Sequence, residues 1–286
     1  MGPLDLAQLS ALRDRTNGRP ETSIGLIDGP VALNQPDLAG ANPHEVPGSL
    51  RGTCNRADTV ACMHGTFVAG VLAARRGSVA PAIFAGCTLL LGPISAETAR
   101  GDVQIPNATP EQLAEIVDCV DAGARLLDLS AALAHPSSKG ERQLKDALDY
   151  AASRRAISVA AAGNKGSVGG STITCHPAGI PVAACDLQGR PLNESKLGIS
   201  IGRRGLMAAG IGVTSVGTSG KSHTLGGTSA AAPFVTGAIA LLWSEFPAAR
   251  ADEVKLAITR CGRQSRNTIV PPLLDAWGAY ETISRR

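Results

Sequence analysis

The sequence predicts an α/β protein built on a doubly wound, mostly parallel sheet with helices on both faces, giving three layers (α/β/α). Short apolar segments alternate along the chain with longer segments of helical periodicity, as right-handed crossovers between parallel strands require. Hydrophobic residues make up 44% of the 286 residues, but aromatic residues only 3%. The core is therefore expected to consist mainly of Ala, Val, Leu and Ile.

The individual elements follow from periodicity and from turn and capping residues. Strands are predicted at 22–27, 89–92, 125–130, 156–162, 180–185 and 211–216. Helices are predicted at 4–16, 63–74, 109–122, 139–153, 229–243, 251–259 and 274–283. The polar stretch 43–60 lacks periodicity and is expected to be a surface loop. Since no repeat or linker interrupts the chain, we expect one domain, 1–286, with a helical extension at 1–20 and a C-terminal segment, 261–286, packed on its body.

Composition excludes several classes of partner. The net charge is +3, with acidic and basic residues interspersed, so no basic stripe is available for nucleic acid. No apolar run is long enough to span a membrane, and residues 1–7 lack the pattern of a secretory signal. We therefore expect a cytoplasmic protein with neither a nucleic-acid nor a membrane partner. Seven cysteines without a C-x-x-C pair favour buried thiols over a metal site.

Three polar residues stand at the ends of predicted elements, and each has an ordinary structural explanation. Asp28 follows the strand 22–27, where parallel sheets place ligand sites, although an aspartate before Gly-Pro also caps turns. His64 opens a helix beside Gly65, which permits close approach, but a lone histidine there is usually structural. Asn164 follows the strand 156–162 in a turn, a conformation that asparagine adopts readily.

Ser229 lies at the start of an Ala-rich helix, after Gly226, Gly227 and a candidate N-cap, Thr228. Unpaired backbone N–H groups and the helix dipole would stabilise an oxyanion at this position. A serine or threonine before an apolar run is nevertheless far more often only a cap. Ser229 is thus a candidate nucleophile only in combination with the other polar residues.

The combination of Asp28, His64, Asn164 and Ser229 resembles the site of the subtilisin-like serine proteases. Asp28 lies in IGLIDG (24–29), His64 in HGTFVAG (64–70) and Ser229 in GTSAAAP (227–233), in the family order Asp, His, Ser. The segment AAGN (161–164) resembles the family's oxyanion block. The resemblance covers roughly residues 20–260 and implies a serine endopeptidase that acts through an acyl-enzyme, with no metal and no cofactor.

The resemblance also implies a role for each of these residues. Ser229 would attack the scissile carbonyl, His64 would act as general base and then acid, and Asp28 would orient the imidazole. Asn164 and the backbone N–H of Ser229 would form the oxyanion hole. The peptide backbone would bind along a substrate edge formed by Ser130, Ala131, Ala132 and Gly163. This edge lacks a glycine that the family has there, whereas departures at Phe67, Ala230 and Phe234 fall on packing positions and should preserve activity.

Within the family, DGPV (28–31), PDLAGAN (36–42) and CMH (62–64) look most like the proteases that mature cyanobactins. This implies a ribosomal precursor peptide as substrate. A general intracellular degradative protease and a pseudoprotease that only binds peptides are the alternatives. The family's calcium loop is shortened to 75–81 and Asp37 lacks ligand partners, so no tight calcium site is expected. In this subgroup Cys54 with Cys62, and Cys175 with Cys185, could form disulfides, which spacing alone does not decide.

Overall fold

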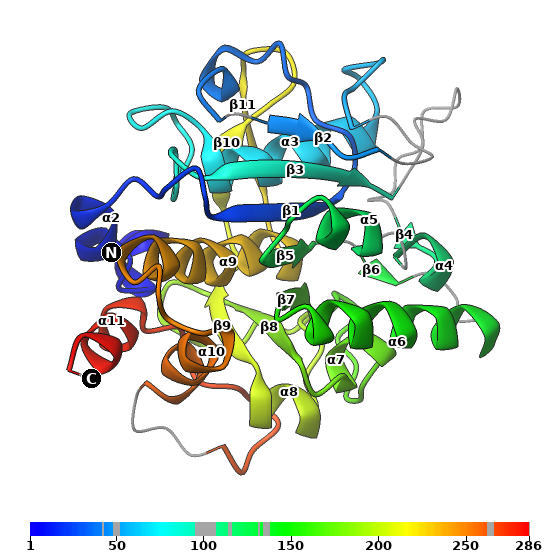
Figure 1. Cartoon of the computed structure of the whole chain (residues 1–286), viewed down its shortest axis with the longest axis vertical. Helices are drawn as coiled ribbons and strands as arrows, with labels where there is room; N and C mark the ends of the chain where they lie inside the picture. The colour runs from blue at the N-terminus through cyan, green and yellow to red at the C-terminus, as the bar shows by residue number, and fades with distance from the viewer. Residues whose placement is uncertain are drawn as a thin grey trace.

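The computed structural model describes residues 1–41, 43–47, 52–94, 107–113, 116–130, 132–133, 138–261 and 266–285, and a seven-stranded sheet forms its centre (Figure 1). The strand order is β2-β3-β1-β5-β7-β8-β9, and each neighbouring pair described in this sheet is parallel. The strands are β1 Ser23–Asp28, β2 Pro43–Glu45, β3 Thr88–Pro93, β5 Leu126–Leu129, β7 Ile157–Ala161, β8 Gly179–Cys185 and β9 Leu206–Ala209. The predicted α/β class is confirmed.

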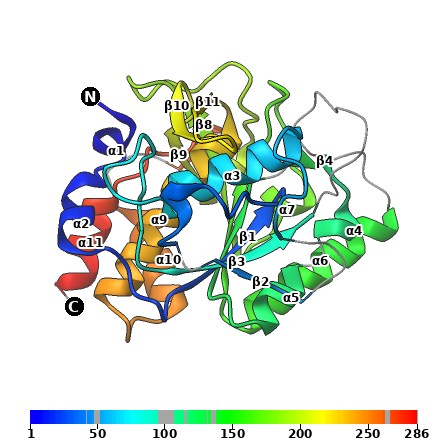
Figure 2. The same cartoon turned by 90° about the horizontal axis from the view of Figure 1, so that it is seen from above.

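Helices cover both faces of this sheet (Figure 2). α3 Val60–Ala73 and α9 Thr228–Glu245 lie on one face, and α5 Ile116–Asp121 and α6 Ser138–Ser153 on the other. Successive side chains of a strand point to opposite faces, so each strand contributes to two cores. The residues of α9 are buried from Thr228 to Ser244, and its small side chains allow it to pack against β5, β7, β8 and β9. The helix that carries Ser229 near its start is therefore central to the core.

Shorter elements complete the molecule, and α2 Ser10–Arg15, near the N-terminus, lies beside α11 Ala276–Ser284, near the C-terminus (Figure 1). The remaining helices are α1 Pro3–Leu6, the 3₁₀ turn η1 Pro36–Leu38, α4 Pro110–Leu113, α7 Thr172–Cys175, α8 Ile199–Arg204 and α10 Ala251–Arg260. The remaining strands are β4 Asn107–Ala108, β6 Ala132–Leu133, β10 Val213–Val216 and β11 Ser222–Leu225.

Three predicted helices differ from the observed ones. The helix expected at 4–16 is divided into α1 and α2 around Gln8, whose φ of 52° is incompatible with a continuous helix. The helix expected at 109–122 comprises α4 and α5, and residues 114–115 lie outside the described part. α3 begins three residues earlier than expected, because the Thr59 side chain accepts the backbone N–H of Cys62 and caps the helix.

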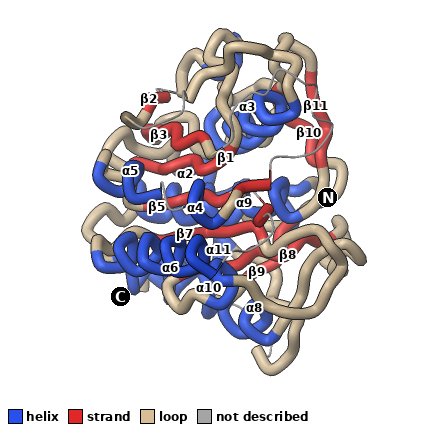
Figure 3. Tube along the Cα trace, turned by 90° about the vertical axis from the view of Figure 1, so that its right-hand side faces the viewer, coloured by secondary structure: helices blue, strands red, loops and turns tan. Residues whose placement is uncertain are grey.

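Strand predictions were less complete than helix predictions. β2 occupies part of the stretch expected to be a loop and pairs with β3 at the edge of the sheet. β9, with the sequence LMAA, was not predicted because two of its four residues are alanines, which have low strand propensity. The predicted strand at 211–216 contains β10, which pairs antiparallel with β11 in a hairpin beside α3, apart from the main sheet (Figure 3).

Candidate active site

Asp28 and His64 form a buried pair at the carboxyl edge of the sheet. Asp28 ends β1, and its Oδ1 lies 2.6 Å from Nδ1 of His64, the fifth residue of α3. The same oxygen accepts the backbone N–H of Gly29 at 2.6 Å. Asp28 is fully buried and His64 is 2% exposed. The contact leaves Nε2 as the histidine nitrogen available to a further partner.

Glycines on both sides of the contact bring α3 against the turn that follows β1. A Cβ on Gly65 would overlap the carbonyl oxygens of Gly29 and Pro30, and a Cβ on Gly29 would overlap the carbonyl oxygen of Ala61. Any larger residue at either position would push the helix away from the strand. The expected role of Gly65 in permitting close approach is confirmed.

The surroundings of His64 make its imidazole a stronger base than a free one. Burial lowers the pKa of His64, but the charge and hydrogen bond of Asp28, together with the charge of Asp128, outweigh burial and raise the pKa above its usual value. Asp128 was not singled out in the sequence. The available signal was a charged residue with a leucine on each side, within the strand 125–130.

A disulfide fastens the segment that precedes His64. Cys54 is bonded to Cys62 of α3, with a Cα–Cα distance of 5.7 Å. The backbone around Cys54 is also paired with Val31, because Cys54 N–H donates to the Val31 carbonyl at 3.1 Å and Val31 N–H donates to the Gly52 carbonyl at 2.8 Å. The bridge therefore links α3 to the segment that follows Asp28.

One of the two implied disulfides is thus confirmed, and the other is wrong. Cys175 is an exposed free thiol at the end of α7, and Cys185 is a buried free thiol at the carboxyl end of β8. Cys185 is the last of the seven residues of β8, whereas Cys175 lies before the strand begins. A strand of that length spans about 20 Å, far beyond the reach of a disulfide.

Ser229 is the second residue of α9 and is 4% exposed. The predicted N-cap is wrong by one position, because Gly227, with φ of 87°, is the N-cap and Thr228 is the first helical residue. Ser229 makes no side-chain hydrogen bond to another residue in the described ranges, and its backbone N–H has no acceptor there. Both the hydroxyl and the N–H of Ser229 are thus available to a ligand.

Asn164 supplies the cap that the helix would otherwise lack. Its Oδ1 accepts the backbone N–H of Thr228 at 2.8 Å and the Thr228 hydroxyl at 3.0 Å. Gly163 N–H donates to the same hydroxyl oxygen at 3.1 Å. A Cβ on Gly227 would lie 2.8 Å from Oδ1, so only glycine allows this approach. Because Oδ1 accepts both the N–H and the hydroxyl of Thr228, the amide nitrogen Nδ2 remains free to donate elsewhere.

The substrate edge suggested by the resemblance is described only in part. Ser130 is fully buried, and its hydroxyl donates to Asp128 Oδ1 at 2.8 Å, so its side chain points inward. Ala131 lies outside the described residues. Ala132 pairs with Asn107 between the short parallel strands β6 and β4. The Gly163 carbonyl accepts the N–H of Lys196 at 2.8 Å, which anchors the loop that carries Asn164.

Other expected features concern metal and membrane binding. Across the described ranges no group of three or more His, Cys, Asp or Glu side chains is placed to hold a metal ion. Asp37 forms an ion pair with Arg75 at 2.9 Å. In the same ranges, none of the helices combines the length and the apolar character that crossing a membrane requires.

The subtilase family model matches residues 19–270, a span that includes Asp28, His64, Asn164 and Ser229. This chain belongs to the subtilase family. Mycosin-3 of Mycobacterium tuberculosis is 29% identical to this subtilase over 274 residues, which cover 76% of this chain and 59% of mycosin-3. Subtilisin DY of Bacillus licheniformis is 30% identical over 239 residues, covering 81% of this chain and 80% of the relative. The prediction of a subtilisin-like serine protease is confirmed.

Solved structures show the same fold over nearly the whole subtilase. A mutant of the protease domain of PatA superposes with a TM-score of 0.83 at 26% identity, covering 94% of this chain and 97% of that structure. The prenylagaramide maturation protease PagA superposes with a TM-score of 0.82 at 25% identity, covering 96% of this chain and 98% of that structure. The predicted similarity to maturation proteases of this type is also confirmed.

Proposed function

We propose that this subtilase is a serine endopeptidase that cleaves a dedicated precursor peptide. The observation that carries the proposal is the buried pair in which Asp28 Oδ1 lies 2.6 Å from His64 Nδ1. This pairing orients the imidazole with Nε2 free, as a general base for a serine nucleophile requires. Ser229, at the start of a buried helix, is the residue that we assign as nucleophile.

Proton transfer follows from these positions. Ser229 Oγ attacks the scissile carbonyl carbon while Nε2 of His64 takes the hydroxyl proton. The imidazolium then gives this proton to the leaving amine, and an acyl-enzyme remains on Ser229. Asp28 stays ionised throughout and stabilises the imidazolium through the contact at Nδ1. Water then attacks the acyl carbon with His64 again as base, which releases the second product and restores the hydroxyl.

The oxyanion that forms in each step needs hydrogen-bond donors that are already in place. We assign this role to Nδ2 of Asn164 and to the backbone N–H of Ser229. The first is left free because Oδ1 is bound to Thr228, and the second has no acceptor in the described part of the chain. A donor of this kind stabilises the transition state by about 3 to 4 kcal/mol.

The class of substrate is inferred from maturation proteases with the same fold. PatA and PagA are described as maturation proteases for patellamide and prenylagaramide, and each aligns with this chain at 25% identity with both chains almost fully covered. A precursor peptide would bind in extended form, with its backbone along the edge of Ser130, Ala131, Ala132 and Gly163. No metal or cofactor takes part in this mechanism.

Two measurements test the proposal. A fluorophosphonate probe should label the folded wild-type protein and leave the Ser229→Ala variant unlabelled, and an unlabelled wild-type protein would contradict the assignment. A diverse peptide library, with cuts mapped by mass spectrometry, should yield few cuts that share one motif. Many unrelated cuts would identify a general degradative protease, and binding without cuts would identify a peptide-binding pseudoprotease.

A further inference from the structure

A second buried carboxyl group, Asp128, lies beside the candidate catalytic pair and has no role in the mechanism above. It belongs to β5, which pairs with β1 so that Asp128 stands opposite Leu26 and Leu129 opposite Ile27. Leu26 and Leu126 both belong to the core that α3 and α9 cover. Asp28 and Asp128 each lie two residues further along their strands, so both carboxyl groups face these helices.

The polar atoms around Asp128 are incompletely paired. Asp128 is fully buried, and its Oδ1 accepts the Ser130 hydroxyl at 2.8 Å. Its Oδ2 and the Oδ2 of Asp28 are buried without a hydrogen-bond partner in the described structure, and the buried Thr236 hydroxyl lies close enough to favour the carboxylate form of Asp128. Thr236 lies seven residues after Ser229, which is two turns along the same face of α9. Unpaired carboxyl oxygens in a dry core are costly unless a proton is present.

Two neighbouring carboxylates cannot both be ionised in such a core without a large cost. Asp28 is paired with His64 and carries the charge that the histidine requires. Burial raises the pKa of Asp128 to about 7, and the charge of Asp28 adds to this, while the hydroxyls of Ser130 and Thr236 and the charge of His64 oppose it. Asp128 is therefore the carboxyl group that takes up a proton as the pH falls through about 7.

We propose that Asp128 is a positioning residue whose ionisation is coupled to proton uptake by His64. As a carboxylate Asp128 stabilises the imidazolium of His64, and as a neutral acid it does not. Asp128 exchanges its proton with solvent water as the pH changes, while the proton that His64 takes up comes from Ser229. The inference rests on the proposed function, because it assigns His64 as the base. Among the described residues, the titratable groups that face Asp128 are Asp28 of β1 and His64 of α3, whereas α9 contributes the uncharged Thr236 and β7 contributes Val159 in register.

The coupling has a definite sign. The charge of Asp128 raises the pKa of His64, and the charge of His64 lowers the pKa of Asp128. The two groups thus titrate together, and the carboxylate keeps a proton on His64 to higher pH. Asp128→Asn retains the shape and an acceptor for Ser130 but removes the charge. The acid limb of activity should then move to lower pH by about half a unit or more.

The experiment compares the wild-type protein, Asp128→Asn and Thr236→Val. Thr236→Val removes a hydroxyl that favours the carboxylate, so its midpoint should move in the same direction as that of Asp128→Asn but by less. The rate at which a fluorophosphonate labels Ser229 is measured against pH, and the His64 titration is followed by NMR. Lower midpoints in both variants support the proposal. Unchanged midpoints in the folded variants overturn it.

Difference infrared spectroscopy provides a readout that does not depend on activity. The wild-type protein should show the carbonyl band of a protonated carboxylic acid at mildly acidic pH, and Asp128→Asn should lack this band. The same band in both proteins would contradict the proposal. If the wild-type protein is not labelled by the probe, the proposed function fails, but the infrared band and the NMR midpoints still decide the role of Asp128. If Asp128→Asn does not fold, Thr236→Val carries the test.

Discussion

The Asn164 side chain and the backbone of Thr228 are joined by a hydrogen bond of 2.8 Å that connects the loop after β7 to the first turn of α9. The Thr228 hydroxyl adds a second bond of 3.0 Å to the same oxygen. One oxygen atom thus caps the helix that carries Ser229 and fixes the amide of Asn164 in one orientation. Helix capping and oxyanion binding are therefore expected to depend on different atoms of one side chain.

Two substitutions at Asn164 separate these contributions. Asn164→Asp keeps an oxygen for Thr228 but loses the N–H donor, so kcat should fall about a hundred- to a thousandfold while the free energy of unfolding changes little. Asn164→Ala loses both atoms, so its free energy of unfolding should also fall by about 1 kcal/mol. Steady-state kinetics and urea denaturation measure the two effects. Wild-type kcat in Asn164→Asp would exclude the amide as an oxyanion donor.

A matched pair of glycine substitutions tests the close approach of Asn164 to α9. Gly227 has φ of 87° and a Cβ there would meet Asn164, whereas Gly220 has φ of 76° and open space around it. Alanine at either position should cost about 1 kcal/mol of stability through backbone strain. Only Gly227→Ala should also displace Asn164 and reduce kcat, by about a hundredfold. Equal kcat in the two variants would show that the position of Asn164 does not depend on Gly227.

The disulfide between Cys54 and Cys62 should stabilise the protein measurably. It closes a short loop, with a sequence separation of 8, so its loss should lower the free energy of unfolding by about 2 to 3 kcal/mol. The double variant Cys54→Ser/Cys62→Ser should also lose activity, because the bridge anchors the helix two residues before His64. Guanidinium denaturation with and without reductant provides the measurement. Cys175→Ser, which removes an exposed free thiol, is the control and should retain its sensitivity to reductant.

The sequence predicted the elements whose signals are local. Asp28 and His64 followed an apolar strand and opened a small-residue helix, and the structure places their side chains in contact. The Gly65 signal was also local, because a close approach requires a glycine whatever its partner. Each of these patterns spans only a few residues, so it can be recognised in a single sequence.

Features that depend on distant residues could not be predicted in this way. Thr228 is a residue type that often caps helices, but Asn164, 64 residues away, provides the capping oxygen. Asp128 stands out in the sequence only as an acid between two leucines, and its neighbours Asp28 and His64 are brought beside it by β1 and α3. β9 contains two alanines and is a strand because β8 offers it an edge. In each case tertiary packing decides the outcome.

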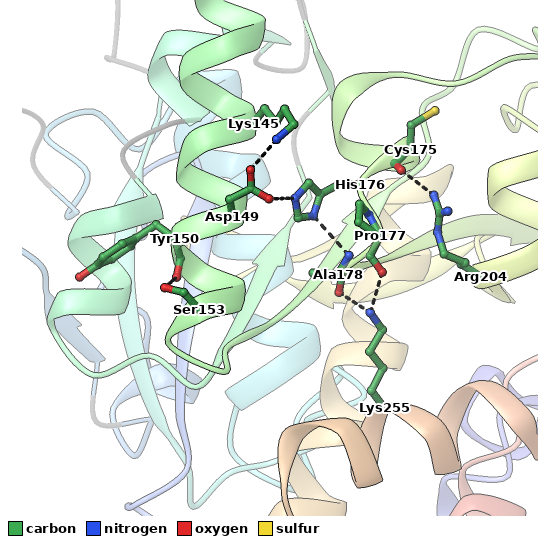
Figure 4. Close-up of polar contacts among 10 residues, drawn as sticks. All are labelled: Lys145, Asp149, Tyr150, Ser153, Cys175, His176, Pro177, Ala178, Arg204 and Lys255. Carbon is green, nitrogen blue, oxygen red and sulfur yellow. Dashed lines mark hydrogen bonds and ion pairs between the residues drawn. The ribbon is translucent and has the colours of Figure 1, made fainter.

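A polar cluster around the segment that precedes β8 contains two lysines in contrasting surroundings (Figure 4). Lys255 of α10 donates to the carbonyls of Pro177 at 3.0 Å and Ala178 at 2.6 Å. Lys145 of α6 instead contacts Asp149 at 2.5 Å. Burial lowers the pKa of Lys255 to about 8, with the charge of Arg204 adding to this effect. The hydrogen bond and charge of Asp149 raise the pKa of Lys145.

The two lysines should therefore differ in their reaction with a trace amount of acetic anhydride, since only the neutral amine reacts. Lys255 should become reactive around pH 8, and Lys145 only at higher pH than an ordinary lysine. The unfolded chain keeps a proton on Lys255 up to its usual pKa of 10.5, so the unfolded state binds more protons between pH 8 and 10.5. The contribution of Lys255 to stability should accordingly rise with pH across this window. Lys255→Met should abolish that rise in urea denaturation, and a rise that persists in the variant would assign it to another group.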